Sequence, residues 1–289
     1  MTSIIENALQ EISEKFTEKL QNNGLFPWQY PIKRQVNNEY EYKIAQKLLE
    51  FSYKVPVHNK QAEEGLPDVV KLNPPRFNVV IPLNTTIRSM PANVLWFFYS
   101  KKMNIVVLSF TGTYNKATWL VDFDYIQKNP VEINNYTNGM KIHGGFWDFY
   151  LSIQNELLDL LSKYVDCKTQ ILITGISLGG AMSSICALDL YKRKLSNCVK
   201  LNNNVHYSFE SPRVFNNVAQ QKYDSLNMST YRIINGSDIV PVVPFPIMPP
   251  DSETFTHVST QIYFNTNMGN YFDNHVTACL NKYKVRTII

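Results

Sequence analysis

The sequence lacks the long apolar run that a membrane-spanning helix needs, and it has no run of lysines and arginines. Its cysteines number four among 289 residues, and their spacing matches neither a metal site nor a disulfide framework. Residues 1–7 have neither the basic start nor the unbroken apolar core of a secretory signal peptide. These absences argue against a transmembrane, nucleic-acid-binding or metal-binding protein, and they predict cytoplasmic localisation with reduced thiols.

The composition is that of a chain that can bury a large core. Hydrophobic residues make up 44% and aromatic residues 13%, and the formal net charge is a mild +4. This length fits one large domain. Residues 4–21 and 38–53 have the apolar spacing of amphipathic helices, and residues 54–75 are loop-like. We therefore expect residues 1–75 to form a helical extension packed on the main domain, which spans residues 76–289.

The hydrophobic pattern changes near residue 77. Residues 78–81, 94–99 and 105–110 are apolar runs typical of strands, and the last two are joined by a short polar turn that predicts a hairpin. Helices and strands then alternate: helix 147–164, strand 170–175, helix 178–193, strand 204–209, helix 214–224, strand 230–234 and a late strand at 262–264. Such alternation predicts an α/β fold with a central, mostly parallel sheet flanked by helices.

Gly175, Ser177 and Gly179 form the motif G-x-S-x-G between a predicted buried strand and a predicted helix. A serine on such a tight turn is the nucleophile elbow of α/β hydrolases, where flanking glycines let the helix and the strand pack closely. The alternative without a catalytic role is a glycine-rich turn with a capping serine. The context of strand before and helix after favours the elbow.

A serine hydroxyl is a weak nucleophile that needs a base, and the base needs an acid that orients it. In this architecture the chain order is serine, acid, histidine. Asp238 follows a predicted strand and is the acid that we expect, with Asp251 and Asp273 as alternatives to this assignment. The other role open to Asp238 is loop capping.

The base should come from a loop beyond the last strand. His275 lies in such a polar segment, so it is preferred over His257, which begins the late strand. His206 lies upstream of Asp238 within a strand, and chain order disfavours it. Two backbone N–H groups should form an oxyanion hole, and we expect these from Leu178, after the serine, and from Thr113, after an earlier strand.

Several ordered motifs resemble the class 3 lipases, the fungal-lipase-like branch of the α/β hydrolases, over roughly residues 94–285. The counterparts of the family motifs are Thr111-Gly112-Thr113, Trp119, His143-Gly144-Gly145-Phe146, Gly175 to Ala181, Pro212-Arg213-Val214, Asp238-Ile239-Val240-Pro241 and Asp273-Asn274-His275. Thr111 stands where the family usually has arginine, and Ile176 where it usually has histidine. Neither departure removes a member of the expected triad.

The resemblance implies a lid over residues 114–128. Trp119, Leu120 and Phe123 make this segment apolar for a surface loop. The alternative is a helix packed permanently on the domain. A lid would cover the serine in water and open at a lipid interface, which the protein would contact transiently.

We expect a serine carboxylester hydrolase that cleaves acylglycerol-type lipid esters through Ser177, Asp238 and His275, with no cofactor and no metal. A phospholipase A1 or a non-lipid esterase on the same fold is the nearest alternative. The alternative from another class is a catalytically inactive lipid-binding protein.

Overall fold

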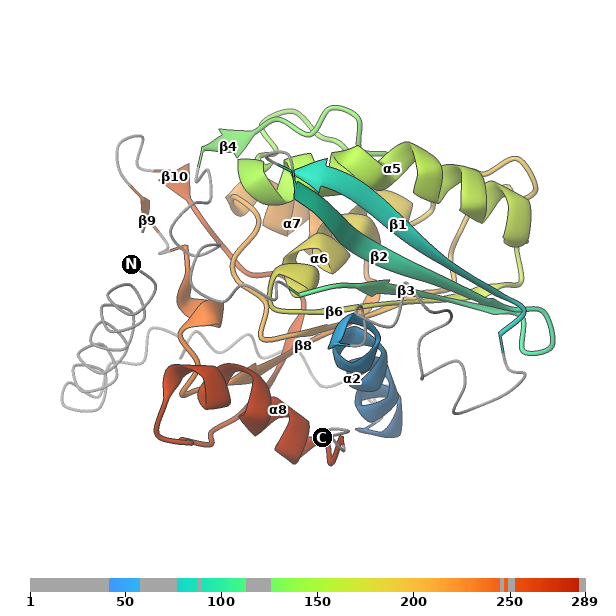
Figure 1. Cartoon of the computed structure of the whole chain (residues 1–289). Coiled ribbons are helices and arrows are strands. Elements are labelled where there is room, and N and C mark those ends of the chain that lie inside the picture. The colour runs from blue at the N-terminus through green and yellow to red at the C-terminus, as the bar shows by residue number, and fades with distance from the viewer. Residues whose placement is uncertain are drawn as a thin grey trace.

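A computed structural model describes residues 42–57, 77–87, 90–112, 126–244, 247–248 and 253–285 (Figure 1). The predicted helix over residues 4–21 lies outside these ranges. A seven-stranded sheet has the spatial order β1-β2-β3-β6-β7-β8-β11. Its strands are β1 (Val79–Ile87), β2 (Met90–Ser100), β3 (Ile105–Phe110), β6 (Gln170–Ile176), β7 (Asn204–Phe209), β8 (Ser229–Asn235) and β11 (Thr260–Phe264).

The sheet is antiparallel at one side and parallel in the rest. β1, β2 and β3 are antiparallel neighbours, and the pairing of Ser100 with Ile105 confirms the predicted hairpin. From β3 through β6, β7 and β8 to β11 every pair is parallel, as the alternation of helices and strands predicts. The carboxyl ends of these parallel strands therefore meet at one edge of the sheet.

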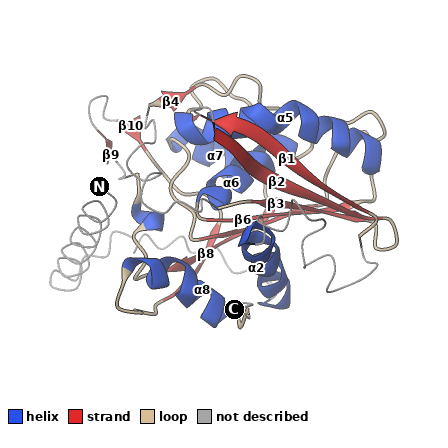
Figure 2. Cartoon of the chain, in the orientation of Figure 1, coloured by secondary structure: helices blue, strands red, loops and turns tan. Residues whose placement is uncertain are grey.

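Helices cover both faces of the sheet (Figure 2). They are α2 (Tyr42–Val57), α5 (Gly144–Tyr164), α6 (Leu178–Leu190), α7 (Asn217–Ser225) and α8 (Ala278–Lys282), with a 3-10 turn η1 (Val240–Val242) and a π-helical turn η2 (Asp273–Thr277). The helices α5, α6 and α7 lie on one face, and α2 and α8 on the other (Figure 1). Four short strands form two further pairs: β4 (Gln127–Lys128) with β5 (Ile142–His143), and β9 (Ile247–Met248) with β10 (Glu253–Thr254).

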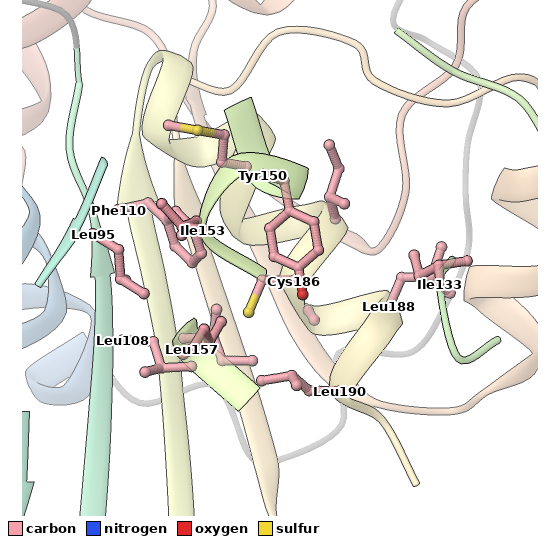
Figure 3. Close-up of a cluster of buried hydrophobic side chains, with 14 of the residues drawn as sticks. Leu95, Leu108, Phe110, Ile133, Tyr150, Ile153, Leu157, Cys186, Leu188 and Leu190 are labelled. Carbon is pink, nitrogen blue, oxygen red and sulfur yellow. The ribbon is translucent and has the colours of Figure 1, made fainter. Parts of the chain in front are cut away.

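The larger core lies between the sheet and α5 and α6 (Figure 3). Along α5, Tyr150, Ile153 and Leu157 recur at helical spacing and are fully buried. Every residue of α6 is buried, so this helix is apolar around most of its circumference. A fully buried leucine or phenylalanine stabilises the fold by about 1.5–3 kcal/mol, and α6 is therefore held firmly against the sheet.

The second core lies under α2. Ala45, Leu48 and Leu49 are buried against the sheet, and the Ser52 hydroxyl shares a hydrogen bond of 2.9 Å with Thr174 Oγ1 on β6. The helix runs to Val57, four residues beyond the predicted end at residue 53. The division of the chain at residue 75 stays a prediction.

Cys167 and Cys198 form a disulfide, with their Cα atoms 4.9 Å apart, so the prediction of reduced thiols is wrong for these two residues. Cys167 precedes β6 and Cys198 precedes β7, and these neighbouring parallel strands begin at the same edge of the sheet. Cys186 and Cys279 are buried free thiols. Among the described helices, none combines the length and the hydropathy needed to cross a bilayer.

Candidate active site

Ser177 occupies the turn between β6 and α6, with φ 60° and ψ −127°. An L-residue rarely adopts such a backbone conformation, which costs of order 1–3 kcal/mol and persists only where the surroundings hold it. The Ser177 N–H donates to the carbonyl oxygen of Phe209 at 2.9 Å, and its carbonyl oxygen accepts from Gly180 N–H at 2.9 Å. Ser177 is 7% exposed.

The flanking glycines are required by close backbone packing. A Cβ atom on Gly175 would collide with the backbone of Gly179, and one on Gly179 would collide with the carbonyl oxygen of Phe110. A Cβ on Gly180 would lie 2.8 Å from the Cβ of Ser211. The helix can thus start directly against β3 and β6 because these positions have no side chain.

Asp238 and His275, which are far apart in sequence, are brought together at the sheet edge where Ser177 lies. His275 Nδ1 is 2.6 Å from Asp238 Oδ2, and Asp238 Oδ1 accepts the N–H of Val240 at 3.0 Å. His275 is 6% exposed and Asp238 is 3% exposed. Nε2 of His275 is also buried and has no hydrogen-bond partner among the described residues.

Asn235 links the Asp238 turn to the segment that carries His275. Its Nδ2 donates to the carbonyl oxygens of Thr266 and Asn274, both at 2.8 Å, and its Oδ1 accepts the N–H of Thr266 at 2.8 Å. Asn235 is 1% exposed. Sequence reasoning missed this residue, because an asparagine at a strand end is typical of any turn.

The other sequence candidates lie elsewhere. His257 Nε2 is 2.6 Å from the carbonyl oxygen of Pro241, and burial, followed by the charges of Arg232 and Arg213, holds the pKa of His257 well below its usual value.

His206 is buried between Ser183 and Tyr223, and burial lowers its pKa to about 3. Asp273 accepts from Thr277 Oγ1 at 2.6 Å within η2, and Asp251 lies outside the described residues.

Part of the predicted site also lies outside the described residues, namely Thr113 and the predicted lid residues Trp119, Leu120 and Phe123. The chain leading to Thr113 is described: a Cβ on Gly112 would lie 3.2 Å from the carbonyl oxygen of Ile176 and 3.9 Å from Ser177 Cβ. The end of β3 therefore lies beside the serine. Leu178 is the first residue of α6, where backbone N–H groups have no partner within the helix.

A family model described as lipase (class 3) matches residues 107–248, which include the whole serine turn and Asp238. The chain belongs to the class 3 lipase family. A lipase of Rhizomucor miehei is 30% identical over 166 residues, which cover 56% of this chain and 42% of that protein. Phospholipase A1-IIgamma of Arabidopsis thaliana is 28% identical over 160 residues, 48% of this chain and 38% of that protein. The matched part thus spans about two fifths of these relatives.

The fold is the α/β-hydrolase fold of fungal lipases. The solved triacylglyceride lipase of Rhizomucor miehei superposes with a TM-score of 0.60 at 22% identity, over 80% of this chain and 82% of that one. The lipase of Rhizopus microsporus var. chinensis gives a TM-score of 0.61 at 20% identity, over 83% and 84% of the two chains. At these identities the likeness concerns the fold.

The expectation of cytoplasmic localisation is wrong. Two relatives from Malassezia globosa, at 29% and 30% identity, are secreted mono- and diacylglycerol lipases. The expectation depended on the composition of residues 1–7 and on reduced thiols, and the disulfide between Cys167 and Cys198 removes the second support. Disulfides are typical of proteins from oxidising compartments.

Proposed function

We propose that this class 3 lipase family member is a serine carboxylester hydrolase that cleaves acylglycerol-type lipid esters. The observation that carries the proposal is the buried contact of 2.6 Å between His275 Nδ1 and Asp238 Oδ2, at the sheet edge where the strained turn presents Ser177. A solved triacylglycerol lipase of this fold, at 24% identity, has a serine-protease triad as its catalytic centre.

In the proposed reaction, His275 Nε2 accepts the Ser177 hydroxyl proton as Oγ attacks the ester carbonyl carbon. Asp238 holds the proton on Nδ1, so that Nε2 is the basic nitrogen, and it stabilises the imidazolium. The imidazolium then protonates the departing alcohol, and the acyl group remains on Ser177. His275 next takes a proton from the water that attacks the acyl-enzyme, and it returns this proton to Ser177 Oγ as the acid leaves. Burial of both partners strengthens their electrostatic interaction.

The negative oxygen of the tetrahedral intermediate needs donors that are already in place. We assign the Leu178 N–H, because it lies at the start of α6, where the helix dipole adds positive potential. We assign Thr113 N–H as the second donor, because the chain leading to it passes beside Ser177. Each such donor contributes about 10²–10³-fold to the rate.

The proposed substrate is a lipid ester, and the proposed lid includes Trp119, Leu120 and Phe123. The described end of this segment supports a surface position: Ile126 is 65% exposed, and β4 directly after it pairs with β5. An apolar cover that opens on contact with a lipid interface would couple activity to that interface. Transient contact with lipid therefore forms part of the proposal.

A phospholipase A1 is the second candidate, because relatives with that name match about as much of the chain as the lipases do. The chemistry at Ser177 is identical for both, and the head group distinguishes them. A catalytically inactive lipid-binding protein is the remaining alternative.

The test is hydrolysis of p-nitrophenyl esters from acetate to palmitate by wild type and Ser177→Ala. Ser225→Ala, which changes an exposed serine at the end of α7, is the matched control. We expect turnover that rises with chain length in wild type and in the control and is lost in Ser177→Ala.

Two other outcomes and one further assay decide between the alternatives. Turnover of short esters alone would indicate an esterase. Emulsified triacylglycerol compared with phosphatidylcholine vesicles distinguishes a lipase from a phospholipase. No turnover on any of these substrates would favour the binding protein.

A further inference from the structure

Glu210 is a second carboxyl group beside Asp238, and the proposed triad chemistry does not use it. It directly follows β7, and its N–H donates to the carbonyl oxygen of Ile233 on β8 at 2.9 Å. Both of its carboxyl oxygens lie 2.9 Å from the backbone nitrogen of Asn235. The Glu210 carboxyl is thereby anchored where β8 ends and the turn to Asp238 begins.

The backbone of Glu210 has φ 47°, in the left-handed region that favours glycine. The side chain is nevertheless completely buried, at 0% exposure. A buried glutamate in a strained conformation persists only where its surroundings hold it, and such strain clusters at functional sites. A function of the Glu210 carboxyl group would account for a strained and buried glutamate at this position.

The Glu210 carboxyl lies within hydrogen-bonding reach of the Asp238 carboxyl. An ionised carboxylate only accepts hydrogen bonds, so two carboxyl groups can bond directly only when one of them holds a proton. Asp238 Oδ1 accepts the N–H of Val240 at 3.0 Å and Oδ2 lies 2.6 Å from His275 Nδ1, so both of its oxygens serve as acceptors. Glu210 is therefore the group that holds the proton.

The surrounding groups act in both directions: the Asn235 N–H and the Cys279 thiol lower the pKa of Glu210, but the two largest causes raise it. Burial, and then the charge of Asp238, raises the pKa of Glu210 well above its ordinary value. The Cys279 thiol on α8 donates to Glu210, and burial followed by the two carboxyl groups raises the pKa of that thiol, which stays protonated. The titratable and charged groups on the elements around Glu210 are Asp238, Cys279, Arg232 on β8, and His275 and Tyr271, which act through Asp238. Arg232 is buried, and burial lowers its pKa to about 9.

We propose that Glu210 is a positioning residue of the hydrolase: it stays protonated and donates a hydrogen bond that holds the Asp238 carboxyl group in the orientation in which it contacts His275. This inference rests on the function proposed above. Glu210 touches neither substrate nor reacting atoms and acts through Asp238. The protonated group fixes the aspartate without adding a second negative charge to the site.

The first test is infrared difference spectroscopy of the resting protein near neutral pH, and it needs no catalysis. We expect the carbonyl stretch of a buried, protonated carboxylic acid in wild type and its loss in Glu210→Gln. Glu156→Gln, which changes an exposed glutamate on α5, should keep the band. Absence of the band in wild type, or its persistence in Glu210→Gln, would overturn the proposal whether or not the protein hydrolyses esters.

The second test compares kcat and KM for Glu210→Ala and Glu210→Gln, with urea unfolding to verify that each variant is folded. A hydrogen bond to a charged group corresponds to about tenfold in rate, so Glu210→Ala should lose about tenfold or more in kcat with little change in KM. The glutamine amide can still donate, and Glu210→Gln should recover most of that loss. Equal losses in both variants, or full activity in Glu210→Ala, would contradict a hydrogen-bond donor role.

Discussion

The Tyr150 hydroxyl on α5 donates a hydrogen bond of 2.7 Å to Oδ2 of Asp189 on α6. Asp189 is fully buried and also accepts from Gln154 at 2.9 Å and from Arg193 at 2.5 Å. Burial, followed by the charge of Asp189, raises the pKa of Tyr150, so the phenol remains a donor. These contacts connect α5 to the helix that begins directly after Ser177.

Removing the Tyr150 hydroxyl should therefore weaken the helix layer above the sheet. Tyr150→Phe keeps the ring but deprives a buried carboxylate of one donor, and we expect unfolding free energy to fall by about 1.5–3 kcal/mol. Urea unfolding monitors this change. The matched control is Tyr164→Phe, since Tyr164 is half-buried and its hydroxyl makes no hydrogen bond among the described residues. A loss as large in the control would show that the Asp189 contact is not the cause.

The close packing at the serine turn predicts that Gly179→Ala disrupts both stability and activity. Its new Cβ would meet the carbonyl group of Phe110, and backbone atoms there cannot move aside as a flexible side chain can. Overpacking of this kind costs about 1–3 kcal/mol. The start of α6 would have to shift, and Ser177 directly precedes it.

Gly139→Ala is the matched control for this variant. Gly139 has φ 85°, and a Cβ added there would meet only the two Val218 methyl groups, at 3.8 and 3.9 Å, which is ordinary van der Waals contact. It should lose stability by about 1 kcal/mol while the folded protein keeps the proposed esterase activity. Esterase activity per folded molecule, corrected by thermal unfolding, distinguishes the two variants.

The strands and most helices could be predicted because apolar runs and helical spacing are local signals. The end of α6 was predicted at residue 193, but the helix ends at Leu190. The reason is a long-range contact: Lys192 N–H donates to the carbonyl oxygen of Leu201 at 2.6 Å, and Leu201 N–H donates back to Arg193 at 3.0 Å. No local pattern encodes that pairing.

The candidate site likewise has residues that local patterns predict and residues whose roles depend on long-range contacts. Chain order, together with the positions of Asp238 after a predicted strand and of His275 beyond the late strand, selects these two residues, and the structure brings them together. Glu210 and Asn235 were missed because their roles depend on neighbours across β7, β8 and the η2 segment. The disulfide was missed because Cys167 and Cys198 meet only when β6 and β7 lie side by side. The catalytic roles of Ser177, Asp238 and His275 stay predictions.

The disulfide encloses β6 and α6, and therefore Ser177, within a loop of 31 residues. Closing a loop of this size removes conformational freedom from the unfolded chain and stabilises the fold by about 3–4 kcal/mol. A reducing agent should lower the wild-type Tm correspondingly. The double variant with Cys167→Ser and Cys198→Ser should have the lower Tm already and show no response to the reductant. A reductant effect in the double variant would point to another cause.

Because His206 is buried as a neutral side chain, we expect the protein to lose stability in acid. Its Nε2 and Nδ1 each lie 2.9 Å from a hydroxyl oxygen, of Ser183 and Tyr223 respectively, and burial lowers its folded-state pKa to about 3 from the ordinary value of 6.5. The unfolded chain binds a proton below about pH 6.5 that the folded protein does not bind until about pH 3. Stability is thus complete above the unfolded-state pKa and is lost as the pH falls.

The contribution of His206 between about pH 7 and about pH 5 should be about 2 kcal/mol. His206→Gln should show a correspondingly smaller loss of unfolding free energy over this interval, measured by urea unfolding at both pH values. The slope should not vanish, because the lowered pKa of His257 acts with the same sign in both proteins. Equal losses in wild type and variant would contradict a neutral, buried His206.

The assignment of His275 rather than His257 as the base is tested by a matched pair of variants. His275→Gln removes the partner of Asp238, whereas His257→Gln changes a buried histidine whose Nε2 faces the carbonyl oxygen of Pro241. We expect kcat for ester hydrolysis to fall about 10³–10⁴-fold in His275→Gln, and Asp238→Asn to fall similarly because asparagine favours the wrong imidazole tautomer. His257→Gln should change mainly the urea midpoint. A large kcat loss confined to His257→Gln would assign the base to that residue instead.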